Sequence, residues 1–300
     1  ISLTNIMVSL LDLKKQITGI KNTQKITKAM QLVAASKMQQ FQKKALATRD
    51  YVTTLLNILS NNLESFSDCS YNVKTDSKKI MYILYSSDKG LCGSLNTKLF
   101  NTLTRSKKWQ EANEKELVVI GKKAFNLAKA KNIEVKKYFE AIPEKLDLDS
   151  ILDVSDFIIT SYLSGEYAEI CIIAPHYVNS FTTYPVVKTL LPFSNEMVKD
   201  HVGHMEIEFA KKKADFTIFE PSQEEFIDSL FENLIKSLFI QDFLQLKAAE
   251  YSSRMIAMKN ATDSASKIVD EKTLIMNKAR QAAITQEIAE LAGAKAAMEN

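Results

Sequence analysis

Residues 222–292 read SQEEFIDSLFENLIKSLFIQDFLQLKAAEYSSRMIAMKNATDSASKIVDEKTLIMNKARQAAITQEIAELA, with no glycine or proline between Pro221 and Gly293. Because those two residues interrupt helices most strongly, this run of 71 residues predicts one α-helix about 106 Å long at 1.5 Å per residue. Helices of globular domains average about 11–12 residues. Most of this helix therefore has to leave its own domain and lie against something else.

A second long helix is predicted at the start of the chain, where Gly19 is the only glycine before Gly90 and the first proline is Pro143. Ser9 offers an N-cap with an acidic residue, Asp12, three positions later, so we expect the helix to begin near Ser9. Apolar residues at Leu10, Leu13, Ile17 and Ile20 follow the alternating spacing of three and four that is typical of a coiled-coil seam, and further apolar residues continue as far as Leu63. The predicted length is about 55 residues, or ~82 Å.

The C-terminal helix begins with a capping box, since Ser222 and Glu225 can each bond the other's backbone N–H group. Residues 226–246 are apolar enough to raise the question of a membrane span. Polar residues nevertheless recur at about the helical period, which leaves one polar stripe. The stripe consists of Asp228, Ser229, Glu232, Asn233, Lys236, Ser237, Gln241, Asp242 and Gln245. We therefore expect this segment to pack on protein rather than on lipid.

After Glu250 the apolar residues become small or flexible, which predicts a narrow seam rather than a core. Two long helices at opposite ends of one chain pair most simply as an antiparallel coiled coil. If Leu63 lies level with Ser222, paired positions sum to about 285, because both helices rise 1.5 Å per residue. This register sets Met30 level with Met255 and its neighbour Arg254, and leaves the last turns without an internal partner.

The middle of the chain alternates short β-branched or aromatic runs with helical stretches, which favours a parallel sheet with crossover helices. The predicted strands are 80–85, 117–120, 133–139 and 168–174, and the predicted helices are 95–106, 122–130 and 148–163. A run at 181–191 contains Pro185 and predicts an edge or bent strand. The charged segment 193–215 is expected to be a loop.

The predicted fold class is thus an α/β head with a mostly parallel, Rossmann-like sheet, plus a long antiparallel coiled coil of the N- and C-terminal helices. We expect an N-terminal coiled-coil helix at 7–64, an α/β globular domain at 77–220 and a C-terminal coiled-coil helix at 222–295.

Composition is that of a soluble protein, with 46% hydrophobic and 25% charged residues and a net charge of +3. Residues 1–50 carry nine Lys or Arg against two Asp, so the first helix is basic. Its lysines are spread around the helix without interleaved aromatic residues, which favours an acid-facing helix over nucleic-acid binding. Cys69, Cys92 and Cys171 lack C-x-x-C spacing, so a reducing compartment is expected, and no signal or transit segment is recognised.

Signals for chemistry are weak. The segment Ser86 to Ser94 follows a strand and opens a helix, where a phosphate loop would lie, but it matches neither glycine fingerprint. A tight strand-to-helix turn is the favoured interpretation, with Cys92 as a buried packing residue. His201 and His204, with Glu206 and Glu208, form a weak candidate metal cluster. We therefore expect no catalytic, cofactor or metal site, and a function carried by the long helices.

Three segments of the helices carry a specific resemblance. They are NTQKITKAMQLVAASKM at 22–38, SRMIAMKNATD at 253–263 and NKARQAAITQE at 277–287. They resemble the gamma subunit of F-type ATP synthases, and the similarity covers the chain from about Met7, including the turn at 86–96. Residues 140–220 match least specifically. The paired-cysteine insertion of chloroplast members is not present in the sequence.

The resemblance implies a rotor with no catalytic site or cofactor of its own. In that family the coiled coil stands inside a ring of three alpha and three beta subunits, and the head binds the epsilon subunit and the membrane c-ring. It also implies a peripheral location on the cytoplasmic face of the bacterial inner membrane or, alternatively, on the matrix side of the mitochondrial one, without direct membrane insertion. By the same resemblance, Met30 and Arg254 lie near acidic loops of beta subunits, and Arg280, Gln281 and Thr285 contact a beta-subunit catch loop.

Two other classes of function stay open at this point. The helical hairpin can be a coiled-coil scaffold or adaptor with an α/β domain that supplies localisation, or the chain can be a small α/β enzyme with a helical arm. Co-purification with a ring of ATPase subunits supports the rotor, a helical peptide partner supports the adaptor, and nucleotide bound to the isolated chain supports the enzyme.

Overall fold

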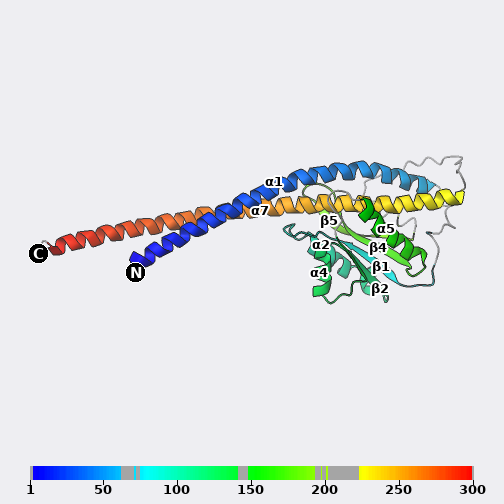
Figure 1. Ribbon diagram of the computed structural model, residues 1–300, viewed down its shortest axis with the longest axis horizontal. Coiled ribbons are helices and arrows are strands. Elements are labelled where there is room, and N and C mark those ends of the chain that lie inside the picture. Colours follow the sequence, from blue (N-terminus) through cyan, green and yellow to red (C-terminus); the bar gives the residue numbers. More distant parts are fainter. Residues whose placement is uncertain are drawn as a thin grey trace. The chain divides into compact units, whose positions relative to one another are not determined.

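The structure is a computed structural model that describes residues 3–61, 71, 75–140, 148–192, 197, 201 and 223–298. The chain divides into two compact units, and the boundary between them falls inside each of its two longest helices, which Figure 1 shows. The first unit comprises 1–34 with 255–300, and the second comprises 35–254. The predicted domain bounds at 7–64, 77–220 and 222–295 instead follow the helix ends, and they stay a prediction.

The two long helices are present as expected. Helix α1 is Leu3–Asn61 and helix α7 is Gln223–Met298. The prediction that the first helix begins near Ser9 is wrong by about two turns, because neither glycine nor proline lies upstream of Ser9 to stop the helix there. Ser222 and most of the expected loop at 193–215 lie outside the described residues.

The α/β elements follow the predicted alternation. Their bounds are β1 Ile80–Tyr85, α2 Leu95–Arg105, α3 Lys107–Glu111, β2 Lys115–Ile120, α4 Lys122–Ala130, β3 Lys137–Phe139, α5 Leu148–Leu163, β4 Glu169–Tyr177 and β5 Thr183–Leu191. The run at 133–139 yields a strand only over its last three residues. The short helix α3 was not predicted.

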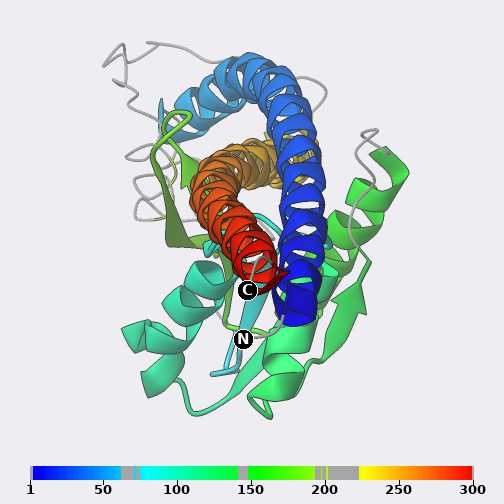
Figure 2. The ribbon, with the colours of Figure 1, turned by 90° about the vertical axis from the view of Figure 1, so that its left-hand side faces the viewer.

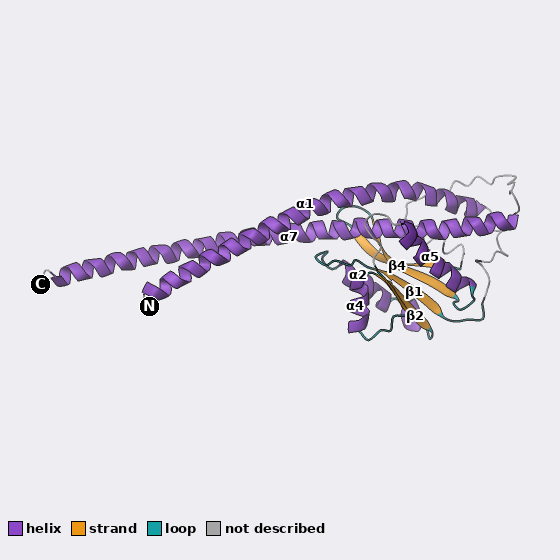
Figure 3. Ribbon diagram, viewed as in Figure 1, coloured by secondary structure: helices purple, strands orange, loops and turns teal. Residues whose placement is uncertain are grey.

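These strands form one sheet in the order β3-β2-β1-β4-β5, and Figure 3 shows β2, β1 and β4 side by side. Strands β1 to β4 are parallel, with Ile80 opposite Lys115 on β2 and Glu169 on β4. Strand β5 pairs antiparallel with β4 at the edge, as its proline predicts. Five of the six β1 residues are buried, which explains why the central strand is a continuous apolar run.

In the second unit, α7 lies between α1 and the sheet (Figure 1). The Tyr251 ring stacks on Phe41 of α1 with centroids 5.7 Å apart. On the other side, the Phe239 ring meets Tyr85 of β1 edge to face at 5.4 Å. All residues from Gln241 to Glu250 are buried. This part of α7 is therefore the central element of the hydrophobic core.

In the first unit, α1 and α7 run side by side and antiparallel with a narrow seam (Figure 2). Thr27 and Thr262 share a hydrogen bond between their hydroxyls at 2.8 Å, so level positions here sum to 289. The predicted sum of about 285 is therefore wrong by one turn, or about 6 Å. The prediction took Leu63 and Ser222 as level, but no short loop joins these two positions and holds them at the same level. Met30 is level with Lys259 rather than with Met255, and α7 residues beyond about 286 have no α1 partner.

Gly121, between β2 and α4, offers a test of the turn that supports this sheet. Its φ is +96°, and a Cβ placed there would lie 2.2 Å from the Ser86 carbonyl oxygen. We expect Gly121→Ala to lower the free energy of unfolding by about 2 kcal/mol or more, measured by urea denaturation, because both the conformation and the contact are unfavourable. Gly90→Ala is the matched control, since its added methyl would make only ordinary contacts at 3.6 Å with Lys123. An equal loss of stability in both variants would show that the turn has no particular need for glycine at position 121.

Candidate functional site

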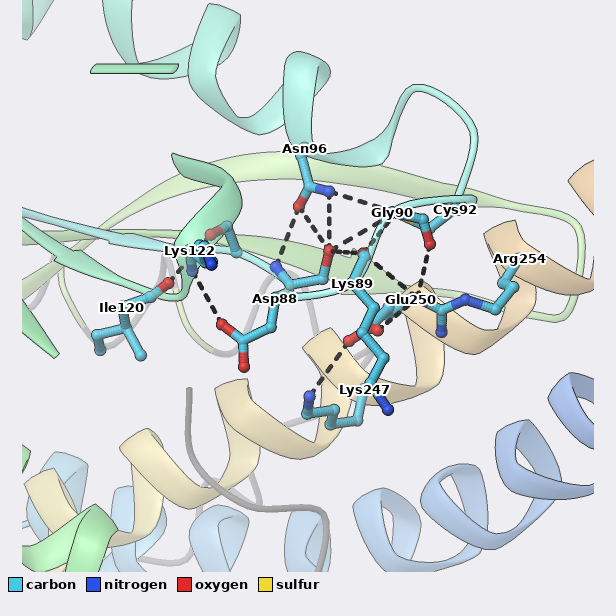
Figure 4. A network of polar contacts seen from close by, with 12 residues as sticks. Asp88, Lys89, Gly90, Cys92, Asn96, Ile120, Lys122, Lys247, Glu250 and Arg254 are labelled. Carbon is cyan, nitrogen blue, oxygen red and sulfur yellow. Dashed lines mark hydrogen bonds and ion pairs between the residues drawn. The ribbon is translucent and has the colours of Figure 1, made fainter. Parts of the chain in front are cut away.

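The turn after β1 is held by a network of hydrogen bonds among its own residues and residues that lie close to it (Figure 4). The Ser87 amide donates to Asn96 Oδ1 at 3.1 Å, and the Lys122 amide donates to Asp88 Oδ1 at 2.9 Å. Asn96 Nδ2 donates to Ser87 Oγ at 2.8 Å. The turn therefore satisfies these groups from within, which favours a structural strand-to-helix turn over a phosphate loop.

Cys92 lies inside this turn and is 2% exposed. Among the described residues, its thiol contacts Ser87 Oγ, Asn96 Nδ2 and the Lys89 carbonyl oxygen. No general base is among these partners. Cys92 is thus a buried packing residue, as the sequence predicted, and Cys171 on β4 is buried as well.

Three buried charged residues of α7 face the turn (Figure 4). The Glu250 carboxylate bonds Lys247 Nζ at 3.2 Å and Arg254 Nη2 at 2.7 Å. Arg254 Nη2 also donates to the Gly90 carbonyl oxygen at 3.2 Å. The predicted contact residue Arg254 is thus 7% exposed and attaches α7 to the turn. Its contact with a partner stays a prediction.

The sheet presents its topological switch point at the carboxyl ends of β1 and β4, where the strand order reverses. In open α/β folds this is the usual place for a ligand. Here α7 lies beside it. The Tyr177 amide at the end of β4 donates to Gln245 Oε1 at 3.3 Å, and Ser252 Oγ donates to the Ser180 carbonyl oxygen at 2.5 Å. The chain's own helix therefore contacts groups at the end of β4 and in the turn after β1.

Sequence reasoning missed a second attachment between α7 and the sheet. Lys188 Nζ of β5 donates to Asp242 Oδ1 at 2.6 Å, and each side chain is 1% exposed. Removing one partner of such a pair costs about 3–5 kcal/mol because the other charge stays buried. Burial, and then the nearby Asp242 carboxylate, raise the pKa of Tyr85 well above its ordinary value, so its hydroxyl stays neutral. The sequence did offer one signal for this ion pair, since the Asp242 carboxylate lies inside the most apolar part of the predicted helix.

The structure describes only one of the four residues of the candidate metal cluster, so the cluster is not tested. His201 is buried, and its Nε2 lies 3.0 Å from the Thr189 carbonyl oxygen. His204, Glu206 and Glu208 lie outside the described residues. Within the described ranges, no group of three or more His, Cys, Asp or Glu side chains is arranged to hold a metal ion.

In the first unit, Met30 of α1 is half-buried beside the seam. Arg280 and Gln281 on α7 are exposed, as is Thr285, whose hydroxyl donates to the Gln281 carbonyl oxygen. The structure thus brings these three residues together on adjacent turns of α7. The Arg280 guanidinium makes no hydrogen bond or ion pair with any residue that the structure describes, so its N–H groups are available to a partner.

The tip of α7 also exposes large aliphatic side chains. Ile284, Ile288 and Leu291 are 48%, 62% and 71% exposed, beyond the seam residue Ala283. Exposed aliphatic residues next to free hydrogen-bond donors are typical of a surface that another chain covers. Among the helices of the described segments, none has the length and apolarity that a membrane crossing requires.

Comparisons with known proteins agree with this geometry. The sequence model of the family described as ATP synthase matches residues 9–298. The ATP synthase gamma chain of Pelotomaculum thermopropionicum is 34% identical over 295 residues, covering 98% of this chain and all of the relative. That of Methylococcus capsulatus is 35% identical over 292 residues, covering 96% and 98% of the two chains.

Solved structures show the same fold. A rotor chain of the Euglena gracilis mitochondrial ATP synthase superposes with a TM-score of 0.62 at 15% identity, covering 92% of this chain and 99% of that one. A central-stalk chain from Tetrahymena thermophila gives 0.58 at 24% identity, covering 79% and 99%. With two paired terminal helices, a Rossmann-like sheet bonded to the C-terminal helix, and this match along nearly its whole length, the chain belongs to the ATP synthase gamma chain family.

Proposed function

We propose that the protein is the central-stalk rotor of a proton-translocating F-type ATP synthase and couples proton flow through the membrane ring to ATP synthesis and hydrolysis. The observation that carries the proposal is the family match over residues 9–298, which includes both long helices. Rotation of a shaft with unequal faces presents different contacts to chemically identical catalytic subunits. Each subunit is thereby biased toward a different nucleotide affinity.

The proposed partners are the alpha and beta subunits around the coiled coil, and the epsilon subunit and c-ring at the α/β domain. The chain itself is proposed to contribute no covalent chemistry, in keeping with the contacts of α7 at the end of β4 and in the turn after β1. We place the protein on the cytoplasmic face of a bacterial inner membrane, because its curated relatives above are bacterial. The matrix side of the mitochondrial inner membrane is the alternative.

Two groups of residues are proposed to contact beta subunits. Arg280, Gln281 and Thr285 bond a catch loop, which is supported by their exposure on adjacent turns of α7. Met30 and Arg254 lie at the level of the acidic loops. Because Arg254 Nη2 already bonds Glu250 and Gly90, its contribution would come from its other N–H groups. Charge attraction suits a rotating contact because it acts over several Å and survives small rotations.

Co-purification and reconstitution test the function. An affinity-tagged chain, produced in cells that lack their own gamma chain, is expected to recover a ring of alpha and beta subunits and to restore ATP-driven proton pumping in inverted vesicles. Recovery of a single helical partner without a ring would instead support an adaptor. Nucleotide bound to the purified chain alone would revive the enzyme hypothesis.

Arg280→Ala tests the proposed catch-loop contact. We expect ATP turnover of the assembled complex to fall about tenfold, because charge-assisted hydrogen bonds worth ~1.5 kcal/mol are lost. Lys278→Ala is the matched control, since Lys278 is an exposed cation close to Arg280 on the same helix. Equal turnover in the two variants would remove Arg280 from the proposed site.

Met30→Lys tests the level of the acidic loops. The new cation would lie level with Lys259, and its attraction to an acidic loop would over-stabilise one rotary position by about 1–4 kcal/mol at 4 Å. We expect protons pumped per ATP to fall while assembly and ATP hydrolysis persist. Met30→Leu keeps the size and adds no charge, so it is expected to pump normally. Normal pumping by Met30→Lys would place these loops elsewhere.

A further inference from the structure

Residues 237–254 of α7 are enclosed by protein within the second unit, and almost all of them are buried. The apolar members come from every face of the helix, including Leu238, Phe239, Phe243, Leu244 and Leu246. Apolar burial is non-directional and depends on area rather than on the identity of the neighbour. A helix of this kind loses little apolar contact when it slides by one turn, about 5.4 Å.

A buried ion pair distinguishes between registers of α7 on the sheet that apolar contacts alone would not distinguish. Lys188 of β5 meets Asp242 at 2.6 Å, with both side chains 1% exposed. A shift of α7 by one turn in either direction would bring Leu238 or Leu246 to the level of Lys188. Both charges would then be buried without a partner, which proteins tolerate poorly. Asp242 Oδ2 has no hydrogen-bond partner among the residues described, so the carboxylate depends on Lys188.

The pair is not explained by stability alone. Buried ion pairs are often replaced by well-packed apolar residues without loss of stability, and their best-attested use is to select one register. The bonds from the Tyr177 amide to Gln245, from Ser252 to the Ser180 carbonyl oxygen and from Arg254 to the Gly90 carbonyl oxygen agree with the same register. However, each of them joins at most one charged group to an uncharged one, whereas a shift at Lys188 and Asp242 would leave two buried charges without a partner.

We propose that Lys188 and Asp242 are positioning residues that hold α7 in one register against the sheet, so that the α/β domain and the helix turn as one body. The consequence, that the α/β domain and the helix turn as one body, rests on the proposed rotor function. Its structural content, a single register set by one buried ion pair, stands independently of that function. The two parts therefore call for two measurements.

The first measurement uses the isolated full chain. Spin labels at Ser229→Cys on α7 and Val178→Cys after β4 are both on exposed positions. Because Ser180 bonds Ser252, 23 residues beyond Ser229, the labels are separated mainly along the helix axis by about 34 Å. Cys69 is replaced by serine, and Cys92 and Cys171 are buried. We expect one narrow distance distribution, and in the K188M/D242L variant a second population displaced by about 5 Å.

The second measurement uses the assembled synthase in inverted vesicles. We expect K188M/D242L to assemble and hydrolyse ATP, but to pump at least about twofold fewer protons per ATP, the scale on which positioning networks alter coupling. K188R keeps the charge and is expected to retain both the single distance and normal pumping. E232Q/K236M is the matched control, because it removes a more exposed ion pair of the same helix, with side chains 49% and 22% exposed.

The outcomes separate the two proposals. One unshifted distance with normal pumping in K188M/D242L would overturn the register role, and so would cooperative unfolding of that variant, since the pair would then serve stability. A displaced population together with a wild-type chain that supports no pumping would leave the register role standing and reject the rotor function. A loss of pumping in E232Q/K236M equal to that in K188M/D242L would also count against the register role.

Discussion

The enclosure of residues 237–254 of α7 by protein is the constraint on which the second unit depends. A helix surrounded in this way has to find protein partners for most of its polar groups, because a buried polar group without a partner costs free energy. Asp242, Gln245, Glu250 and Arg254 do so with groups of β5, β4, their own helix and the turn after β1. The sheet is therefore joined to the helix at Lys188 within β5, at the end of β4 and at the turn after β1.

Much of this fold could be predicted from the sequence because the decisive signals are local. Absence of glycine and proline predicted the long helix α7, although the helix continues past Gly293 to Met298, and buried apolar runs located β1 and β2. The edge position of β5 followed from Pro185, which cannot donate within a ladder. The parallel arrangement followed from the alternation of strands and helices. Each of these inferences uses only residues that are neighbours in the chain.

What could not be predicted depends on contacts distant in sequence. The register of the coiled coil is set by side chains such as Thr27 and Thr262, which no local pattern pairs, and the register predicted from the helix ends is wrong by one turn. The polar stripe of α7 was identified, but only its first half is exposed. Ser237, Gln241, Asp242 and Gln245 are buried, and their environment depends on strands that precede them by up to about 160 residues. The contact residues at Arg280 to Thr285 came from family resemblance, and their exposure is compatible with that role.

The exposed aliphatic side chains at the tip of α7 have a consequence for the cell that makes this protein. Ile284, Ile288 and Leu291 would face water in any copy of the chain that had not yet met its partners. Uncovered surfaces of this kind favour self-association and capture by chaperones. Under the proposed function, the subunits that cover these side chains have to be available when the chain is made, so that the exposed surface does not drive self-association.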